Sequence, residues 1–517
     1  MDTKKDKQKG VYRFIGGIEK AVNKLPSPFM MFIGLFFIVA ILSFFMRNVA
    51  VINPSTNELV QINNFFSKEG LTWILTTMTS NFSGFASLGL VLTMTLGISL
   101  CEQVGLVDSL LKKSMRGVPA SVMPYLIALI GTCGNLASDT CSVLVPPLAA
   151  IAFLGVGRSP IAGMLCGWIS ANAGFSANLM IAGTDSLLAG ITNTSIQVLL
   201  GADTTFTVDS ACNWYFMAAS TILVALVIGW CTNHIMEPHL GKYTGDAVVS
   251  KEPLTKIQSK ALKNTGIAAL VYMAIILLGI FTRVLSNPDG SIVGSLFLKG
   301  LIPIILMLFI VCGVAYGVTT GFIKSERDVS KAFTKAMSNM GAFVAFCFAG
   351  GQFTALFSWT KIGTVVAIEG AELLQSIGLT GVPFFVCFII LTMLINFLIG
   401  SGSAKWTILG PVFVPMMMLL GYHPAFIQLL YRVGDSPTNA IAPLGAYLYM
   451  ALAVVNEKYD KDMKLGTFIA NCIPTTMILQ VIWILFTIAW YLIGLPIGPG
   501  VTSALPEILF IIFKCNK

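Results

Sequence analysis

Two charged residues, Arg432 and Asp435, stand three positions apart on one predicted helical face, in a stretch between residues 406 and 457 that is otherwise uncharged. Ionisable side chains at membrane depth are costly and are functional candidates by default. A guanidinium such as that of Arg432 binds a carboxylate through two parallel hydrogen bonds. Asp435, or Asp185 in the first half of the chain, can bind and release a proton or lie beside Na⁺. The alternative is a mutual Arg432–Asp435 ion pair that only holds the helix.

Polar breaks interrupt the apolar helices that must position these residues. They fall at GTCGNLASDT (131–140), at ISANAGFSAN (169–178) and again at GTD (183–185), at GSGSAKW (400–406) and at RVGDSPTNAIAP (432–443). Irregular backbone at membrane depth is tolerated only where it lines a cavity or is buried in protein. Oxygen atoms at such breaks suit Na⁺, and the candidate ligands are Asn135, Ser138, Asn172, Gly174, Ser401 and Thr438. Helix capping is the alternative role for each hydroxyl or amide, and for Asp139 it is as plausible as transport.

Trp406 adjoins the 400–406 break and can stack on an aromatic substrate, or can serve only as a packing or interfacial tryptophan. We expect Lys405 to face solvent at this tip. We expect surface roles for the three histidines, His234, His239 and His423.

Composition places these elements in a bilayer. The 517 residues are 56% hydrophobic and 11% charged, whereas soluble domains carry about 25% charged residues, so a soluble enzyme is excluded. The net charge of +8 is not gathered into a patch, so a nucleic-acid partner is not indicated. Eleven cysteines without a C-x-x-C pattern indicate neither disulfides nor a zinc site. The basic segment 1–27 is expected to be an uncleaved cytoplasmic tail.

Apolar runs predict clear spans near 28–48, 86–105, 214–236, 264–283, 298–321 and 469–494. Because Lys and Arg mark cytoplasmic loops, the segments 118–156 and 382–420 are expected to be re-entrant hairpins that enter from opposite faces. A displacement of 264 residues aligns Gly117-Val118-Pro119 with Gly381-Val382-Pro383, and Gly157 and Pro160 with Gly421 and Pro424.

An odd number of crossings between these motifs gives an inverted-topology repeat, which is typical of secondary transporters. The alternative is chance matching in Gly/Pro-rich sequence. The first repeat would span 28–245, with hairpin one at 118–156 and a broken helix at 160–190. The second would span 246–517, with hairpin two at 382–420 and a broken helix at 424–455.

The run SGSAKWTILGPVFVPMMMLLGYHPAFIQLLYRVGDSPTNAIAP (401–443), with GNLASDT and AGTDSLLAGIT in the first half, resembles the p-aminobenzoyl-glutamate transporter (AbgT) family. The resemblance covers nearly the whole chain and implies an all-α polytopic membrane protein with nine transmembrane helices, two re-entrant hairpins and a homodimeric assembly. It is similar to the wider ion-transporter superfamily that includes sodium-coupled dicarboxylate carriers. By motif, the resemblance marks as site residues Asp185, Asn396, Ser403, Trp406, Pro424, Arg432, Asp435 and Pro443.

The leading hypothesis is a secondary active transporter, not an enzyme, in the bacterial inner membrane. It would move an amphipathic aromatic carboxylate such as p-aminobenzoyl-glutamate or a related folate catabolite, coupled to H⁺ or Na⁺. Beyond substrate, coupling ion, lipid and a second copy of the chain, no partner or cofactor is expected. The alternatives are a proton-driven exporter of sulfonamide antimetabolites and, in other classes, an ion channel or a membrane-embedded hydrolase. GSGSAKWT fails the phosphate-loop pattern, which disfavours an ATP-driven pump.

Overall fold

The computed structural model describes residues 28–506, with gaps at 53–58, 115–116, 138–139, 202, 242, 244–253, 291–294, 339, 398, 400 and 443–445. The predicted cytoplasmic tail (1–27) and the candidates Ser138, Asp139 and Pro443 therefore lie outside the described residues.

The described chain is mostly helical, with one antiparallel pair of short strands, β1 (Ala50–Ile52) and β2 (Leu59–Gln61). The helices of the first half are α2 (Pro28–Phe45), α3 (Lys68–Ser83), α4 (Ala86–Gln103), α5 (Leu106–Ser114), α6 (Met123–Gly134), the 3₁₀ turn η1 (Asn135–Ala137), α7 (Thr140–Gly155), α8 (Pro160–Ala173), α9 (Gly183–Leu200), α10 (Trp214–Cys231), the π-helical turn η2 (Thr232–Met236) and α11 (Glu237–Leu240). Those of the second half are α12 (Lys256–Phe281), α13 (Leu296–Lys299), α14 (Leu301–Thr320), α15 (Glu326–Ser338), α16 (Gly341–Trp359), α17 (Ile362–Ser376), α18 (Val382–Asn396), α19 (Gly402–Leu419), α20 (Pro424–Thr438), α21 (Ala446–Lys458) and α22 (Leu465–Ile493).

Each of the six predicted clear spans coincides with a helix. Within the described ranges, four helical segments are long and apolar enough to cross a membrane: Trp214–Leu240, Lys256–Phe281, Leu301–Thr320 and Leu465–Ile493. The other two predicted spans correspond to α2 and α4, with 18 residues each, which are not among these four segments. The total of nine spans implied by the resemblance stays a prediction.

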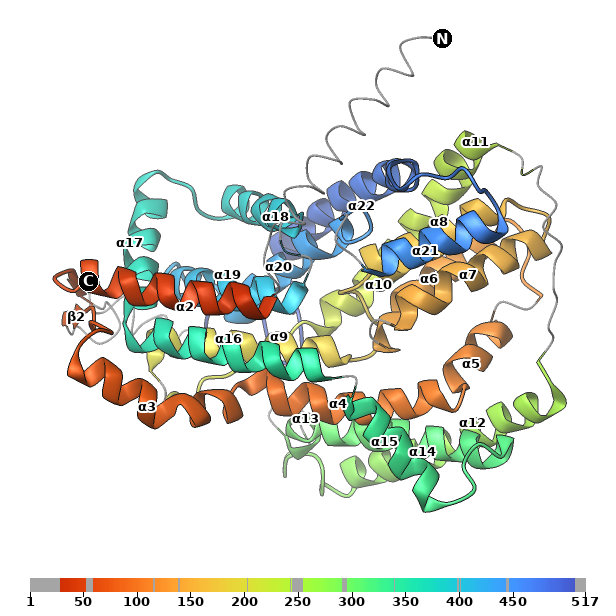
Figure 1. The fold of residues 1–517 in the computed structure, drawn as a ribbon, viewed down its shortest axis with the longest axis horizontal. Helices are drawn as coiled ribbons and strands as arrows, with labels where there is room; N and C mark the ends of the chain where they lie inside the picture. Colours follow the sequence, from red (N-terminus) through yellow and green to blue (C-terminus); the bar gives the residue numbers. More distant parts are fainter. Residues whose placement is uncertain are drawn as a thin grey trace, which may run out of the picture.

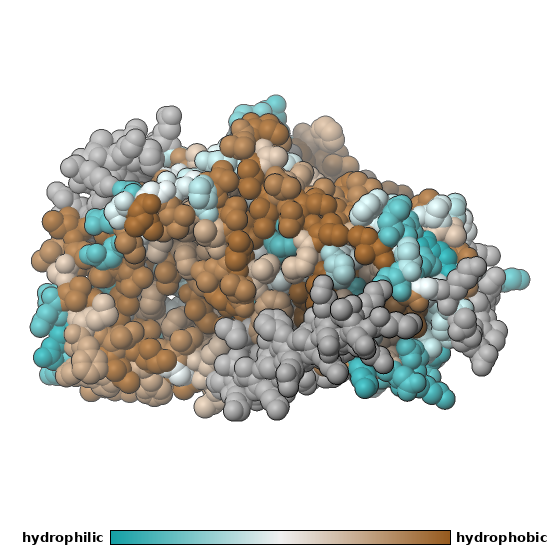
Figure 2. Space-filling view, turned by 90° about the horizontal axis from the view of Figure 1, so that it is seen from above, coloured by the Kyte–Doolittle hydropathy of each residue, from teal (hydrophilic) through white to brown (hydrophobic). Residues whose placement is uncertain are grey.

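Helices α4, α12 and α14 form one side of the molecule, at the bottom of Figure 1, and pack around Leu100, Cys101 and Tyr316. Most of α12 is exposed. Its outer face includes Leu270, Ile275 and Phe281, whose side chains are 68%, 60% and 81% exposed. Apolar residues cover most of the face seen in Figure 2, with hydrophilic ones mostly toward its ends. Such a surface is suited to contact with lipid tails.

The two segments predicted to be hairpins each contain two successive helices, α6 and α7 with η1 after α6, and α18 and α19. Their re-entrant course in the membrane stays a prediction. Each is followed by the turn that the G-x-x-P motif predicts. Gly157 and Gly421 have φ of 76° and 89°, which residues with a side chain rarely adopt. Pro160 and Pro424 then occupy the first turn of α8 and α20, where proline's missing N–H costs nothing.

The first broken helix differs from its prediction in detail. Its break is a single segment, 174–182, between α8 and α9, and the predicted second break at 183–185 is wrong. Gly183, Thr184 and Asp185 instead form the first turn of α9, because the Asp185 carboxylate accepts a hydrogen bond from the Ala182 N–H and so caps the helix. The helix continues to Leu200, beyond the predicted end at residue 190. In the region of the second predicted broken helix, 424–455, the described residues contain α20 and α21, and α21 continues to Lys458.

Helix α20 lies at the centre of the fold (Figure 1), and all fifteen of its residues are buried. It packs against α18 through Gly434. A Cβ atom at position 434 would lie 2.5 Å from the Ile389 carbonyl oxygen and 2.9 Å from the Thr392 Cβ. The small residue therefore sets the spacing of hairpin two from the central helix.

We expect Gly434→Ala to destabilise the protein by about 1–3 kcal/mol, because the methyl group must push α18 away from α20. Gly266→Ala is the matched control, since no atom lies within 4 Å of a Cβ at position 266 of α12. Thermal unfolding in detergent measures both variants. Equal unfolding midpoints for the two would contradict the proposed close packing.

Candidate functional site

Arg432 and Asp435 are both buried on α20, but the predicted alternative, a mutual ion pair, is not what the structure shows. Arg432 pairs with Asp185 of α9, with 2.6 Å between Nη2 and Oδ1. The same nitrogen donates to the Ser176 carbonyl at 2.7 Å, in the break between α8 and α9. The Arg432 Nε is buried without a partner. The guanidinium therefore joins the two broken helices and keeps one donor unused.

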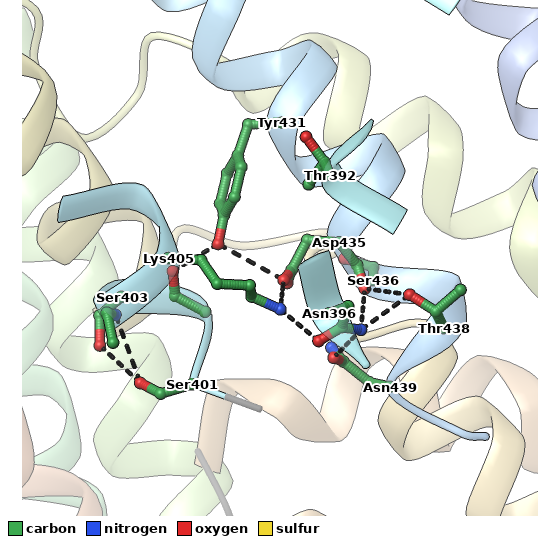
Figure 3. A network of polar contacts seen from close by, with 12 residues as sticks. Thr392, Asn396, Ser401, Ser403, Lys405, Tyr431, Asp435, Ser436, Thr438 and Asn439 are labelled. Carbon is green, nitrogen blue, oxygen red and sulfur yellow. Dashed lines mark hydrogen bonds and ion pairs between the residues drawn. The ribbon is translucent and has the colours of Figure 1, made fainter. Parts of the chain in front are cut away.

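Asp435 pairs with Lys405, and this corrects the sequence interpretation. Lys405 was expected to face solvent, yet it is fully buried and its ammonium contacts Asp435 Oδ1 and Asn396 Oδ1 (Figure 3). The physical reason is where α19 begins. Ser401 caps this helix, so that position 405 already lies in its first turn and the side chain turns inward toward α20 rather than outward from the tip.

Asn396, the last residue of α18, ties hairpin two to the end of α20. Its Nδ2 donates to the Asp435 carbonyl at 2.9 Å, to Thr438 Oγ1 at 2.7 Å and to Asn439 Oδ1 at 2.8 Å. With the amide nitrogen engaged in this way, the Asn396 Oδ1 is left to face Lys405. The predicted site residue Asn396 thus orients the Lys405–Asp435 pair.

The first turn of α19 is tied to α20 as well. The Tyr431 hydroxyl donates to the Gly402 carbonyl and lies 3.4 Å from Asp435 Oδ1. Ser401 Oγ accepts from the Ala404 N–H at 3.3 Å and lies 3.2 Å from Ser403 Oγ. Ser401 therefore has the capping role that was its alternative, with Ser403 beside it.

Trp406 is fully buried and so is not an interfacial tryptophan. Its ring stacks on Tyr431 with 4.6 Å between centroids. Its Nε1 donates to Thr192 Oγ1 at 2.9 Å, which in turn donates to Gln428 Oε1 at 2.7 Å. Gln428 Nε2 then donates to Asn213 Oδ1 at 3.1 Å. This hydrogen-bonded chain connects α19, α9 and α20 with the start of α10.

Three of the candidate ion ligands in the first half, Asn135, Asn172 and Gly174, lie within the described residues. Asn135 Oδ1 and Thr132 Oγ1 are buried without partners, and a Cβ at Gly174 would lie 2.6 Å from Thr132 Oγ1. Asn172 accepts from Ser142 Oγ at 3.2 Å. The described residues contain no group of three or more His, Cys, Asp or Glu placed to hold a metal ion. An oxygen-only site for a monovalent cation is the arrangement that these side chains can support.

Two further predicted site residues behave differently. Pro424 is buried at the start of α20, eight positions before Arg432 and so about 12 Å away along the helix, and the structure does not bring it to the ion pairs. The hydroxyl oxygen of Thr438, a candidate ion ligand, accepts a hydrogen bond from Asn396 Nδ2.

Of the histidines, His234 and His239 are exposed as expected, but the surface role for His423 is wrong. His423 is buried and caps α20, where its Nδ1 accepts from the Ala425 N–H at 3.2 Å.

Sequence reasoning missed Lys405, Tyr431, Thr192, Gln428 and Asn213. A signal for three of them was present. Gln428 and Tyr431 share α20 with Arg432, and polar residues within an apolar span face protein rather than lipid. Lys405 lies directly before the uncharged stretch, and an ionisable residue in such an apolar segment is a functional candidate, as Arg432 is.

Comparison with known proteins agrees with this architecture. A family model described as the AbgT putative transporter family matches residues 13–505. The chain is 38% identical over 496 residues to the p-aminobenzoyl-glutamate transport protein of Escherichia coli (strain K12). These aligned residues cover 95% of this chain and 96% of that protein.

Two solved structures are similar throughout. The YdaH transporter of Alcanivorax borkumensis, whose crystal structure is described as having an unusual topology, is 33% identical, with a TM-score of 0.86 over 92% of this chain and 100% of that one. MtrF of Neisseria gonorrhoeae, described as illuminating a class of antimetabolite efflux pumps, is 35% identical, with a TM-score of 0.87 over 94% of this chain and 100% of that one.

The Arg432–Asp185 pair predicts a coupled effect on stability. Removing one partner of a buried pair leaves an uncompensated charge and costs about 3–5 kcal/mol. We expect Arg432→Met and Asp185→Asn each to lower the unfolding midpoint strongly, and the double variant to recover a large part of the loss. Thermal unfolding of the four proteins in detergent completes the cycle. Additive losses would show that the two charges do not depend on each other.

Proposed function

The chain belongs to the AbgT putative transporter family and is a membrane transporter rather than an enzyme, and from this premise we propose that it is a secondary active carrier of an amphipathic aromatic carboxylate. The proposed substrate class is p-aminobenzoyl-glutamate or a related folate catabolite, by analogy with the E. coli relative. The observation that carries the proposal is the buried Arg432, which retains an unpaired Nε between the two broken helices.

In this mechanism a substrate carboxylate binds the guanidinium of Arg432 in competition with Asp185. A planar guanidinium offers donors in a fixed fork that matches a carboxylate. The stacked pair of Trp406 and Tyr431 lies beside Asp435 and the start of α19, and in this proposal it contacts the aromatic part of the substrate. Substrate binding and release of Asp185 would then be linked, which is how carriage of a proton or Na⁺ by that carboxylate can be coupled to substrate.

The unpaired oxygens of Asn135 and Thr132 near Gly174 support a Na⁺ site at hairpin one. We propose that the two hairpins and broken helices move together against a homodimeric scaffold built from α4, α12 and α14, so that the site opens alternately to each side. The proposed location is the bacterial inner membrane, with a cytoplasmic N-terminus.

Export of sulfonamide antimetabolites is the second candidate, and similarity to the MtrF efflux pump supports it. The two candidates differ in chemistry, because a sulfonamide lacks the carboxylates of p-aminobenzoyl-glutamate. Dependence on Arg432 is therefore expected to be strong for the carboxylate and weak for the sulfonamide.

Flux in proteoliposomes tests the proposed function. We expect accumulation of p-aminobenzoyl-glutamate when a pH or Na⁺ gradient is imposed alone. We expect loss of binding in the Arg432→Met/Asp185→Asn protein, in which no unpaired charge is left and which is expected to recover most of the stability that either single variant loses. If a proton is carried by Asp185 or Asp435, the pH-driven component disappears in the matching Asp→Asn variant. Wild-type affinity in the double variant would exclude the carboxylate clamp, and a response to Na⁺ alone would remove the proton-carrying role from both aspartates.

Opposite hairpin orientations are tested by cysteine labelling. In a background without the eleven native cysteines, Ile399→Cys at the tip of hairpin two should react with a membrane-impermeant maleimide from the non-cytoplasmic side in one state of the cycle. Asn135→Cys should react only from the cytoplasm. Labelling of both positions from the same side would rule out the inverted repeat.

A further inference from the structure

Lys405 places a positive charge where two oxygen atoms converge. Its ammonium contacts Asp435 Oδ1 and Asn396 Oδ1, and the three side chains are 0–2% exposed. The Asn396 amide nitrogen is held by three acceptors, so that its oxygen stays directed at the ammonium (Figure 3). A carboxylate and an amide oxygen fixed in this way form a donor set that a monovalent metal cation also prefers.

The corresponding place in the first half holds no such charge. The displacement of 264 residues that aligns the two G-V-P motifs puts Thr132 opposite Asn396 and Cys141 opposite Lys405. No Lys or Arg occurs between Arg116 and Arg158. Among the described residues of that segment, Thr132 Oγ1 and Asn135 Oδ1 are buried without partners, whereas Asn396 and Asp435 both have partners. At these corresponding positions, therefore, hairpin one has oxygen atoms without partners, whereas at hairpin two a lysine contacts the oxygens of Asn396 and Asp435.

From this contrast we infer that Lys405 is an internal competitor for a mobile monovalent cation at hairpin two. Its ammonium occupies the site formed by Asn396 and Asp435, and a cation binds there only when the ammonium withdraws. The inference deepens the proposed function, because it rests on cation coupling and assigns to Lys405 the control of cation affinity.

The packing around Asp435 explains why the competition is strict. A Cβ at Gly402 would lie 3.3 Å from Asp435 Oδ2, so the first turn of α19 closes directly over the carboxylate. Two positive charges a few ångströms apart in a poorly solvated interior repel each other strongly. A second cation therefore cannot join the ammonium at Asp435.

Withdrawal of the lysine is linked to movement of hairpin two. Lys405 and Gly402 belong to the same turn of α19, and the Tyr431 hydroxyl holds that turn against α20 through the Gly402 carbonyl. Displacing the turn removes the ammonium and uncovers the carboxylate in one step. A mobile cation therefore binds only when the first turn of α19 is displaced, and it is excluded when that turn is packed against α20.

The test is the Na⁺ dependence of thermal stability for the purified full-length protein in detergent, with choline chloride keeping ionic strength constant. A ligand that binds only the folded state raises its stability by mass action. We expect Lys405→Met to lower the Na⁺ concentration for half-maximal stabilisation at least about tenfold, which corresponds to about 1.4 kcal/mol. Lys405→Gln keeps a hydrogen-bond donor and is expected to disturb folding less. It should also lower the Na⁺ concentration for half-maximal stabilisation.

The matched control is Lys405→Met/Asp435→Asn, which removes both charges and should show no gain over wild type. A wild-type Na⁺ midpoint in Lys405→Gln would overturn the inference, as would a gain that persists in the double variant, since the cation would then bind elsewhere. The assay contains no substrate. Failure of p-aminobenzoyl-glutamate flux therefore tests the proposed function separately from this result.

Discussion

A charged side chain inside a membrane protein needs a partner of opposite charge, because burying it unpaired costs several kcal/mol of folding free energy. This constraint organises the centre of the fold. The two charges of α20 are satisfied by different partners, Asp185 from α9 and Lys405 from α19. The fully buried helix α20 is therefore joined by ion pairs to one helix from each half of the chain.

The breaks in the helices are what make these pairings geometrically accessible. The segment between α8 and α9 brings the Ser176 carbonyl to Arg432, and the capped start of α9 presents Asp185 to the same guanidinium. The end of α18 brings Asn396 beneath the end of α20, while the start of α19 delivers Lys405. Continuous helices would satisfy their backbone internally and could not offer carbonyls or helix ends at the same depth.

Sequence patterns predicted this design at the level of elements and residue types. Apolar length predicted the six segments that each coincide with a helix, and Gly and Pro spacing predicted where α8 and α20 begin, whereas the re-entrant course of the two hairpins stays a prediction. The importance of Arg432, Asp435 and Asp185 followed from the rarity of charge. Pairing did not follow, because Arg432 and Asp435 are neighbours in sequence while their partners lie on other helices. The orientation of Lys405 was missed because it depends on where α19 begins, and helix ends shift by one or two residues without altering composition.

The complete burial of α20 also has a consequence for how the protein enters the membrane during synthesis. The outward-facing α12 can partition into lipid by itself, but a helix with Arg432 and Asp435 pays several kcal/mol if it does so alone. Both counter-charges, Asp185 and Lys405, precede α20 in the chain and are therefore synthesised before it. Arg432 is synthesised about 250 residues after Asp185, and at roughly 5–20 residues per second this delay is tens of seconds. During this interval the Asp185 carboxylate lacks the counter-charge that it has in the finished fold, because Arg432 has not yet been synthesised.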